Sequence, residues 1–519
     1  MPRSEEGLAE LRRRRDLAAQ MGGAEQVKRQ HEHGKLTARE RIAALADDGT
    51  LREFGMLAGA GVYDGDKLES FTPKGEVTGF LSLSGRRAVV AAGDFTVRGG
   101  AATRGSGGGL GQELSAARRA LEWRVPYIRL LDASGGSVSS FADIGRTYLP
   151  DGNTYSAVDV QLLQTVPVVS AVLGSVAGLP AVNACLAHFN VMVRGTAQLF
   201  PGGPPVVKAA LGLEVTKESL GGASVHTQGS GVVDNAADSE QDALSQVRAF
   251  LGYLPSSVSE LPPTVAAIEP ALDPLSLRDV IPDNRRQPFD VRAIIGAAVD
   301  AGSFFEIAPR YGSSRVTGLG RVDGYPVGIM ANNPRHYGGA TDAAAGEKVI
   351  RLIQLCDQFH LPLVSFADEP GFLVGPDSER QGIERAGAQL VWTTCQSRMP
   401  WLTFVVSRLF GVAGQCHHRP SGMFRRYAWP SARWGSMHIQ GGVSAAYRRV
   451  IEAADDPAAK QQEIEAELEA LASPFRTAEA TGQDIIDPAD TRGLLVEFVH
   501  DAQRVLAEQT GTPGIPYRP

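Results

Sequence analysis

Cysteine is scarce in this chain, and its scarcity argues against a protein built on disulfides or zinc. Four cysteines occur among 519 residues, and none belongs to a C-x-x-C pair. Such spacing is typical of reduced thiols and does not fit a zinc ribbon. One of them begins Cys416-His417-His418, but adjacent side chains seldom converge on one ion, so we predict structural or surface roles there and no metal site. The cysteines are Cys185, Cys356, Cys395 and Cys416.

Long hydrophobic runs and an excess of positive charge are also missing. No stretch approaches the roughly 18 apolar residues of a membrane span, and the basic run at residues 11–15 lacks a hydrophobic stretch after it. We therefore expect a cytoplasmic protein with no membrane span and no secretory signal. The net charge of −7, from 51 basic and 58 acidic residues, gives no field that attracts nucleic acid or an anionic membrane.

A nucleophile with a neighbouring base is not apparent either. Ser134 lies in no G-x-S-x-G motif, and no Ser, His and Asp stand in the order of a hydrolase triad. The histidines are scattered, and we predict structural roles for His188, His226, His336 and His438. These absences fit chemistry in which two bound substrates react directly while the protein stabilises two enolates.

What the sequence does contain is a long internal repeat. Short motifs of the first half recur 239 positions later, and further along the spacing becomes 236. Chance matches would not stay in register over about a hundred residues, so the repeat indicates duplication of one domain. The first group pairs Val77-Thr78-Gly79, Gly85 and Gly99-Gly100 with Val316-Thr317-Gly318, Gly324 and Gly338-Gly339. The second pairs Pro126, Asp132, Gly135 and Val176-Ala177-Gly178 with Pro362, Asp368, Gly371 and Val412-Ala413-Gly414.

The order of predicted strands and helices indicates an α/β fold in each copy. Strands separated by helices at this spacing are typical of parallel β/α units. A helical arm precedes them up to about Asp47, and Thr37 and Glu40 within it form a capping box. The predicted strands are 76–80, 87–92, 127–132 and 167–173, then 315–322, 327–332, 361–367 and 401–407; the predicted helices are 111–123, 343–359 and 457–472.

The chain is long enough for two domains of about 240 to 260 residues. Seven prolines lie between Pro255 and Pro288, which predicts an extended connection. We therefore divide the chain into a domain of residues 1–260, a linker of residues 261–288 and a domain of residues 289–519. Ligand pockets tend to lie between such domains.

Glycines and small residues follow predicted strands, where open α/β sheets bind ligands. Glycine lets a backbone N–H approach a substrate oxygen, and two adjacent amides can form an oxyanion hole, in which a donor contributes ~3–4 kcal/mol. Tight packing of a helix on the sheet would explain one such pair of small residues. Because similar pairs occur in both copies, a role in binding a substrate oxygen is favoured. The segments are Ser134-Gly135-Gly136, Val176-Ala177-Gly178-Leu179, Pro370-Gly371-Phe372 and Val412-Ala413-Gly414.

A glycine-rich segment, Gly105-Ser106-Gly107-Gly108-Gly109-Leu110-Gly111, precedes a predicted helix. Its amides could hold phosphates, for example the diphosphate of a CoA ester. It lacks the Lys-Ser/Thr ending of a P-loop and does not directly follow a strand, so a loop without a ligand fits the sequence as well.

Taken in order, the motifs resemble the β subunits, or carboxyltransferase components, of biotin-dependent acyl-CoA carboxylases. The resemblance runs from Gly34-Lys35-Leu36-Thr37-Ala38-Arg39-Glu40-Arg41-Ile42 to Ile486-Asp487-Pro488-Ala489-Asp490-Thr491-Arg492. It implies two tandem crotonase-like β/α domains, each a curved sheet flanked by helices, in a homo-hexamer. The motifs between these ends include Asp94-Phe95-Thr96-Val97, Gly203-Pro204-Pro205-Val206-Val207, Leu220-Gly221-Gly222-Ala223 and Ala428-Trp429-Pro430.

The resemblance also implies an enzyme that moves a carboxyl group from carboxybiotin to the α-carbon of an acyl-CoA. The acyl-CoA would bind the N-terminal domain and carboxybiotin the C-terminal domain of a second subunit. Because no Met-Lys-Met sequence occurs, biotin would arrive on a separate carrier charged by a biotin carboxylase. The amides of Gly178 and Leu179 match the pair for the thioester oxygen, and those of Val412 and Ala413 match the pair for the biotin ureido oxygen. Further substrate contacts are expected at Gly135, Gly136, Ala177, Gly371, Phe372, Gly414 and Gln415.

The chain departs from the family pattern at these segments. The family's Ala-Gly-Gly-Ala is Ala177-Gly178-Leu179-Pro180 here, and its Gly-Gly-Ala-Tyr-Asp is Gly411-Val412-Ala413-Gly414-Gln415. Leucine followed by proline should narrow the thioester pocket, and Gln415 replaces an acidic residue that often shapes the acyl site. Two alternatives therefore stay open: decarboxylation of a carboxyacyl-CoA on the same fold, and an inactive homologue that pairs with an active β subunit.

Overall fold

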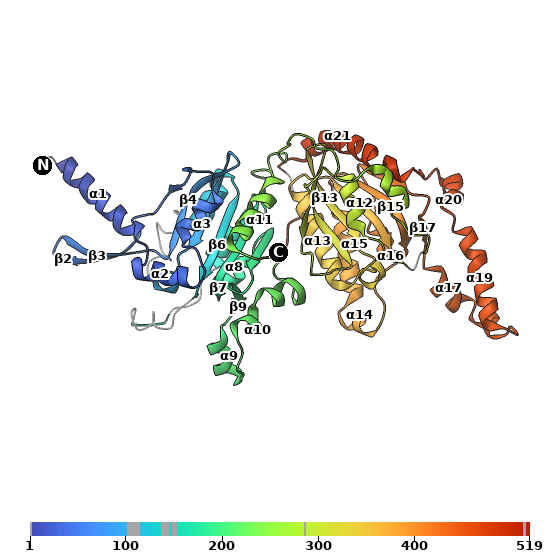
Figure 1. Cartoon of the computed structure of the whole chain (residues 1–519), viewed down its shortest axis with the longest axis horizontal. Coiled ribbons are helices and arrows are strands. Elements are labelled where there is room, and N and C mark those ends of the chain that lie inside the picture. The colour runs from blue at the N-terminus through green and yellow to red at the C-terminus, as the bar shows by residue number, and fades with distance from the viewer. Residues whose placement is uncertain (1–2, 101–114, 136–144, 148–152, 285–286, 512–514) are drawn as a thin grey trace. The chain divides into compact units, whose positions relative to one another are not determined.

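Two units make up the chain, and each contains its own β-sheet (Figure 1). The computed structural model describes residues 3–100, 115–135, 145–147, 153–284, 287–511 and 515–519. Unit 1 comprises Met1–Ser257 and unit 2 comprises Val258–Arg518. Residues 261–288 therefore belong to unit 2, and in residues 261–284 irregular backbone is interrupted by the 3₁₀ helix η3, Pro274–Asp279. Within the described ranges, no helix combines the length and apolarity of a membrane span.

The sheet of unit 1 has parallel central strands. Its described strands follow the order β1-β4-β5-β6-β7-β8-β10, with β9 paired to the end of β7. β4 and β5 form an antiparallel hairpin, whereas β5 to β8 run parallel. β2 and β3 form a separate two-stranded antiparallel sheet. The bounds are β1 Arg52–Glu53, β2 Gly59–Asp64, β3 Lys67–Pro73, β4 Glu76–Leu83, β5 Arg86–Gly93, β6 Tyr127–Ala133, β7 Val168–Ala177, β8 Phe189–Val193, β9 Gln198–Phe200 and β10 Asn235–Ala237.

Helices cover this sheet, and an N-terminal arm extends beyond it. α3 and α11 pack on each other and on strands of the sheet, and α5 packs on β5, β6 and α7. The capping box predicted at Thr37 is confirmed: its side chain accepts from the Glu40 N–H, and the Glu40 carboxylate accepts from the Thr37 N–H. The bounds are α1 Arg3–Ala19, α2 Ala24–Glu32, α3 Ala38–Leu45, η1 Arg98–Gly100, α5 Ala116–Trp123, α7 Asn153–Leu163, α8 Leu179–Cys185, α9 Pro204–Leu211, α10 Lys217–Gly221, η2 Val225–Gly229 and α11 Glu240–Gly252.

Unit 2 repeats this arrangement. Its described strands follow the order β11-β12-β13-β14-β15-β16, with β17 paired to the end of β15. β12 and β13 form the antiparallel hairpin, and β13 to β16 run parallel. The strand bounds are β11 Phe305–Ile307, β12 Arg315–Val322, β13 Tyr325–Asn332, β14 Leu363–Glu369, β15 Trp401–Phe410, β16 Phe424–Ala428 and β17 Arg433–Gly435. The helix bounds are α12 Val291–Ala298, η4 Tyr337–Gly339, α13 Ala343–Gln358, α14 Pro376–Arg380, α15 Ile383–Gln396, α16 Gly411–Gln415, α17 Ile439–Ala446, α18 Arg448–Glu452, α19 Pro457–Leu471, α20 Pro474–Thr481, η5 Pro488–Asp490 and α21 Thr491–Gln509.

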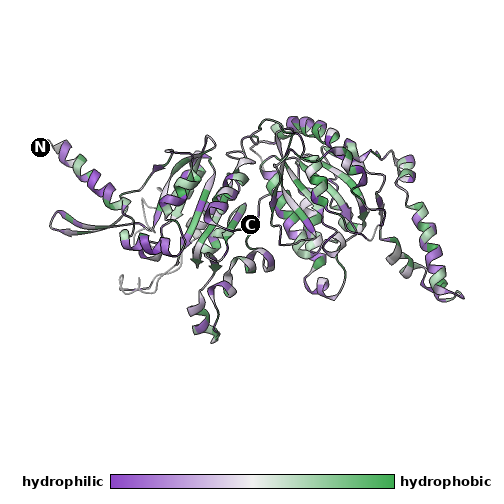
Figure 2. Ribbon diagram, viewed as in Figure 1, coloured by the Kyte–Doolittle hydropathy of each residue, from purple (hydrophilic) through white to green (hydrophobic). Residues whose placement is uncertain are grey.

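The core of each unit lies on its parallel strands, where hydrophobic residues gather (Figure 2). In unit 1 the rings of Phe189 and Phe250 stack at 4.8 Å, and in unit 2 those of Phe366 and Phe404 stack at 5.7 Å. Strands buried on both faces need apolar residues on both sides, which explains their continuous hydrophobic runs. The predicted α/β fold and the predicted parallel central strands are confirmed.

The backbone itself carries the duplication. Eight non-glycine residues with positive φ occur among those described, and six of them form three pairs at the repeat spacings. Such a conformation costs an L-residue about 1–2 kcal/mol, so its recurrence reflects shared geometry. The pairs are Ser84 with Asp323, Arg98 with Tyr337, and Arg124 with His360.

The last repeat spacing predicted from the sequence is wrong by three residues. Tyr127 of β6 pairs with Val168 of β7, and their counterparts Leu363 and Trp401 pair in unit 2, so β7 corresponds to β15 at a spacing of 233. The connection between the paired strands is shorter in unit 2, residues 370–400 against residues 134–167. Val412-Ala413-Gly414 therefore resembles Val176-Ala177-Gly178 in composition without being its structural counterpart.

Candidate active site

Each unit places a glycine turn at the end of its third parallel strand. β7 ends at Ala177 and Gly178 follows with φ 69°; β15 ends at Phe410 and Gly411 follows with φ 64°. Both strands carry a register shift beside the preceding strand just before they end, a local bend that re-aims the chain. A short helix follows each strand: α8 begins at Leu179, directly after Gly178, and α16 begins at Gly411 itself. Because β7 corresponds to β15 at a spacing of 233, Leu179 corresponds to Val412, and both turns occupy the ligand-binding edge of the sheet.

The turn of unit 1 exposes one amide without a partner. The N–H of Gly178 donates to the carbonyls of Phe200, at 3.3 Å, and Pro201, at 3.2 Å. Leu179 opens α8, where the first N–H groups of a helix lack intrahelical acceptors, and among the described residues its amide has none. Leu179 is 54% exposed. Pro180 has no N–H, so it contributes no donor.

The turn of unit 2 contains two such amides. Val412 and Ala413 lie in the first turn of α16, and their N–H groups have no acceptor among the described residues. The Val412 side chain is 53% exposed, whereas Ala413 and Gly414 are buried and Gln415 is exposed. Ala413 corresponds to Pro180, so unit 2 keeps a donor that unit 1 lacks.

Other predicted site residues lie close to these turns or apart from them. Gly135 abuts the strand end of unit 1, because a Cβ there would lie 2.5 Å from the carbonyl oxygen of Ala177. The Gly371 carbonyl accepts from the Thr341 N–H at 3.1 Å, whereas the ring of Phe372 packs against Gly387 of α15. Gly136 and the glycine-rich segment 105–111 lie outside the described residues.

Buried aspartates anchor the strands beside both turns. Asp132 of β6 accepts from Lys35 at 2.9 Å and from Arg41 at 3.1 Å, two cations of the N-terminal arm. Its counterpart Asp368 of β14 accepts from Nε of Arg408 at 2.7 Å and from the Arg408 N–H at 3.0 Å. Both aspartates are buried, so each unit has a carboxylate paired with a cation at this position. The cations come from the N-terminal arm in unit 1 and from β15 in unit 2.

A buried polar network in unit 2 was not predicted from the sequence. The Glu369 carboxylate pairs with the Arg315 guanidinium and accepts from the Thr341 hydroxyl at 2.6 Å and the Gly371 N–H at 3.0 Å. Burial raises the pKa of Glu369, but Arg315, His417 and the Thr341 hydroxyl together outweigh burial and hold that pKa below its ordinary value. The sequence feature that could have predicted the network is the presence of two charged residues, Arg315 and Glu369, within otherwise apolar strands. The network fixes the backbone that leads into Gly371.

His417 extends this network. Its Nδ1 lies 2.6 Å from Oγ of Ser365, and its Nε2 lies 3.7 Å from Glu369, too far for a hydrogen bond. Burial lowers the pKa of His417 to about 4, so the ring is neutral at pH 7. Within the described part of the chain, no three metal-binding side chains converge.

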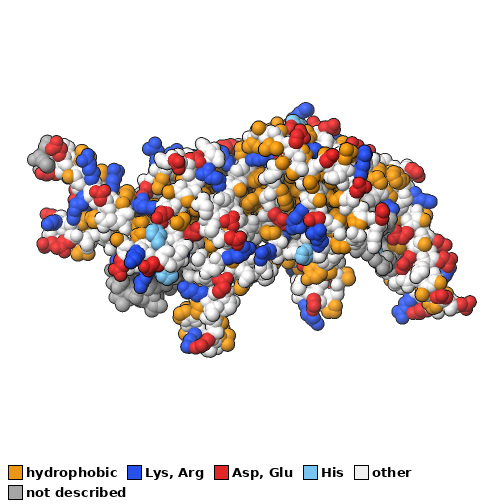
Figure 3. All heavy atoms as spheres, in the orientation of Figure 1, with side chains coloured by type: hydrophobic (Ala, Val, Ile, Leu, Met, Phe, Trp, Pro, Cys, Tyr) orange, Lys and Arg blue, Asp and Glu red, His pale blue; other side chains and the backbone are white. Residues whose placement is uncertain are grey.

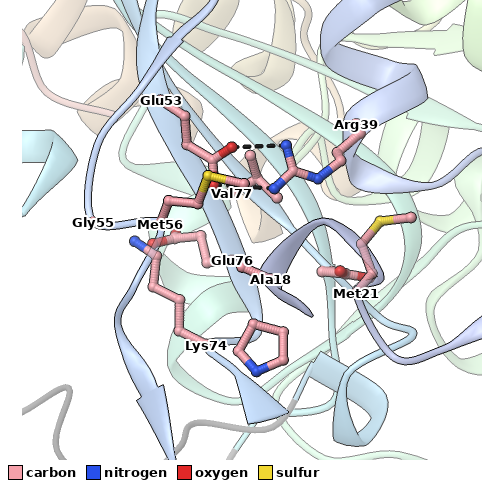
Figure 4. A pocket seen from close by; sticks show the side chains of 11 residues that line it. Ala18, Met21, Arg39, Glu53, Gly55, Met56, Lys74, Glu76 and Val77 are labelled. Carbon is pink, nitrogen blue, oxygen red and sulfur yellow. Dashed lines mark hydrogen bonds and ion pairs between the residues drawn. The ribbon is translucent and has the colours of Figure 1, made fainter. Parts of the chain in front are cut away.

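A hollow elsewhere in unit 1 contains none of the predicted site residues (Figure 4). It surrounds the ion pair between Arg39 and Glu53, whose atoms approach to 2.7 Å. Lys74 also lines it and donates to the Thr78 hydroxyl at 2.8 Å. Because these charged groups already have partners, we assign no chemistry to this hollow.

Comparison with known proteins gives concordant results. The carboxyl transferase domain family matches residues 29–507. The propionyl-CoA carboxylase carboxyltransferase subunit of Haloferax mediterranei is 38% identical over 512 residues, covering 95% of each chain. The methylmalonyl-CoA decarboxylase subunit alpha of Veillonella parvula is 33% identical over 489 residues, covering 92% of this chain and 91% of that one.

Solved structures agree with the sequence relatives. The transcarboxylase 12S structure, described as a hexamer assembly with methylmalonyl-coenzyme A and methylmalonic acid bound, superposes with a TM-score of 0.85 at 31% identity. The match covers 96% of this chain and 95% of that one. The predicted tandem crotonase-like fold is thereby confirmed.

Proposed function

This chain belongs to the carboxyl transferase family, and we propose that it transfers a carboxyl group between carboxybiotin on a separate carrier protein and the α-carbon of an acyl-CoA. The carrier and the biotin carboxylase that charges it are separate partners, because the chain has no Met-Lys-Met sequence. The observation that carries the proposal is the pair of equivalent turns at strand ends: the turn of unit 1 has one unpartnered amide, that of Leu179, and the turn of unit 2 has two, those of Val412 and Ala413. Two such turns suit a reaction in which two oxygens gain negative charge.

In this proposal the N-terminal domain, residues 1–260, holds the thioester. The Leu179 amide donates to the thioester oxygen as the enolate forms. The α-proton passes to N1 of biotin, which has released the carboxyl group, and the α-carbon forms the new bond to that carboxyl carbon. The Gly178 amide joins the Leu179 amide by exchanging its two long hydrogen bonds, of 3.2 and 3.3 Å, for the shorter one to an oxyanion. The Leu179 amide has no such bond to break, so this donor is in place before the reaction and needs no reorganisation.

The C-terminal domain, residues 289–519, holds the biotin ring. Carboxybiotin supplies the carboxyl group when it is bound. The amides of Val412 and Ala413 fit its ureido oxygen, since both are unpartnered and adjacent in the described structure. The buried network of Arg315 and Glu369 keeps the neighbouring strand end in place, so these donors stay aimed without a mobile side chain.

A second candidate, decarboxylation of a carboxyacyl-CoA, is favoured by one specific observation. The Veillonella parvula relative is named as a decarboxylase subunit and is 33% identical over 92% of this chain. The same amides would stabilise the same enolate in either direction, because the two reactions share it. Release of CO₂ from a carboxyacyl-CoA without ATP and biotin carboxylase would select this candidate over carboxylation.

We also propose that the chain assembles as a hexamer, the assembly described for transcarboxylase 12S. The helix α9 and the residues after it leave unit 1 with no buried residue and several apolar ones (Figure 3). Val206 is 59% exposed, Leu211 69% and Leu213 55%. Apolar side chains gathered on a projecting helix are typical of a protein interface, here with another copy of the chain.

The direct test is turnover by the assembled protein. We expect carboxylation of at least one member of an acyl-CoA panel when a biotin carboxylase–carrier subunit, bicarbonate and ATP are supplied. Substitution of Ala413 by leucine should abolish turnover while the oligomer persists, since Ala413 is fully buried beside the donor it provides. Full activity of Ala413→Leu would exclude the assigned biotin-side amides, and turnover of no acyl-CoA in either direction would exclude the function.

A further inference from the structure

Two strained residues occupy the same backbone position in the two units. Arg98, with φ 52°, and Tyr337, with φ 50°, each open a short turn before two glycines, η1 in unit 1 and η4 in unit 2. Bulky residues seldom adopt positive φ, and such strain tends to be kept where it serves function. The other repeated pairs have local explanations: Ser84 and Asp323 lie in hairpin turns, and Arg124 caps the end of α5.

Each turn is hydrogen-bonded to a residue at or near the end of a central strand, β6 in unit 1 and β15 in unit 2. In unit 1 the Gly99 carbonyl accepts from the Ser134 N–H at 3.2 Å, directly after β6. In unit 2 the Gly338 carbonyl accepts from Nη2 of Arg408 at 2.6 Å, and Arg408 lies on β15 just before Gly411. The strained residues thus stand at the ligand-binding edge of each sheet, beside the amides assigned above.

Their side chains differ in chemistry and are available to a ligand. Arg98 is exposed and Tyr337 is 66% exposed. Neither side chain has a hydrogen bond or ion pair with any described residue. A guanidinium recognises carboxylates and phosphates through paired N–H groups, whereas a phenol ring offers an apolar face to a flat neutral ring.

We propose that these two residues determine which ligand each turn accepts: Arg98 binds an anionic group of the CoA thioester, and Tyr337 packs against the ring system of biotin. This inference rests on the proposed function. It adds that Arg98 and Tyr337, which occupy equivalent positions in the two units, distinguish the two substrates. The anionic group is either a CoA phosphate or the carboxylate of the carboxylated thioester, which share the same recognition by a guanidinium.

Crossed kinetics test the proposal in the full-length oligomer. Arg98→Gln should raise KM for the acyl-CoA at least tenfold and change KM for the biotinylated carrier less than twofold. Tyr337→Leu should do the reverse. Arg98→Lys and Tyr337→Phe are the matched controls and should recover most of each loss, because they keep the charge and the ring.

The outcomes separate failure of this inference from failure of the proposed function. Equal changes in both KM values for a variant, or no change in either, would overturn the inference while the wild-type protein still turns over. Absence of wild-type turnover and of acyl-CoA binding by calorimetry would instead remove the proposed function, and the inference with it. If Arg98→Gln raises KM for the acyl-CoA but not for an acyl-pantetheine, which lacks the nucleotide phosphates, Arg98 binds a CoA phosphate. If it raises KM only for the carboxylated thioester, Arg98 binds the carboxylate.

Discussion

Replacing Gly178 by alanine tests whether the backbone geometry of the thioester turn is needed for turnover, because the protein should stay folded after this change. Gly178 has φ 69° and ψ −137°, a region that glycine adopts and alanine avoids. An added Cβ meets no atom within 4 Å, so the cost comes from backbone strain alone, about 1–3 kcal/mol. A domain stable by ~5–15 kcal/mol stays folded at that cost, and the turn relaxes its strain by rotating the Leu179 amide.

A misdirected donor should lower kcat by about 10²–10³, the effect of losing one oxyanion donor. The assay couples acyl-CoA carboxylation to ATP use by the biotin carboxylase partner, with light scattering to verify the oligomer. Gly195→Ala is the matched control: Gly195 also has positive φ, 77°, and open space around its Cβ, but it lies on the turn before β9. It should lose similar stability and keep its activity. Turnover of Gly178→Ala within about threefold of the wild type, or an equal loss in Gly195→Ala, would refute the assigned role.

Burial and exposure lead to three further predictions. Glu369→Ala should lower the free energy of unfolding by about 3–5 kcal/mol in urea titrations, because it leaves the buried charge of Arg315 unpaired; a loss below 1 kcal/mol would contradict the network. His417 has a pKa of about 4 when folded against 6.5 ordinarily, so its contribution is present above pH 6.5 and is lost as the pH falls towards 4; His417→Asn should remove on the order of 3 kcal/mol of that pH dependence, and an unchanged slope of Tm against pH would exclude it. Leu211→Asp should shift the sedimentation coefficient towards smaller species at micromolar concentration, whereas an unchanged distribution would place α9 outside any interface between copies.

Local and periodic features of the fold were predictable from the sequence. The capping box of Thr37 and Glu40 depends on residues three apart, and the strands on runs of apolar residues, so both could be read directly. The paired glycines Gly85 and Gly324 recur in the repeat, and both have positive φ, 78° and 79°, a backbone conformation that favours glycine in a hairpin turn.

The site was less predictable where it depends on pairing between distant residues. The Val-Ala-Gly triplets share composition, but the shorter connection before β15 shifts Gly411 into the place of Gly178. Likewise, Arg315 and Glu369 stand 54 positions apart and meet through sheet pairing, which no local pattern reveals.

Pro180 makes one half of the duplicated chain chemically different from the other. Main-chain donors usually survive evolution, because almost any substitution preserves the N–H group. Proline is the exception, since it deletes the donor while its ring need not touch the substrate. At this position the first half therefore lacks a backbone donor, whereas Ala413 provides one in the second. Pro180→Ala would restore the backbone N–H at this position. The variant would show whether the two similar halves can be made to accept each other's substrates.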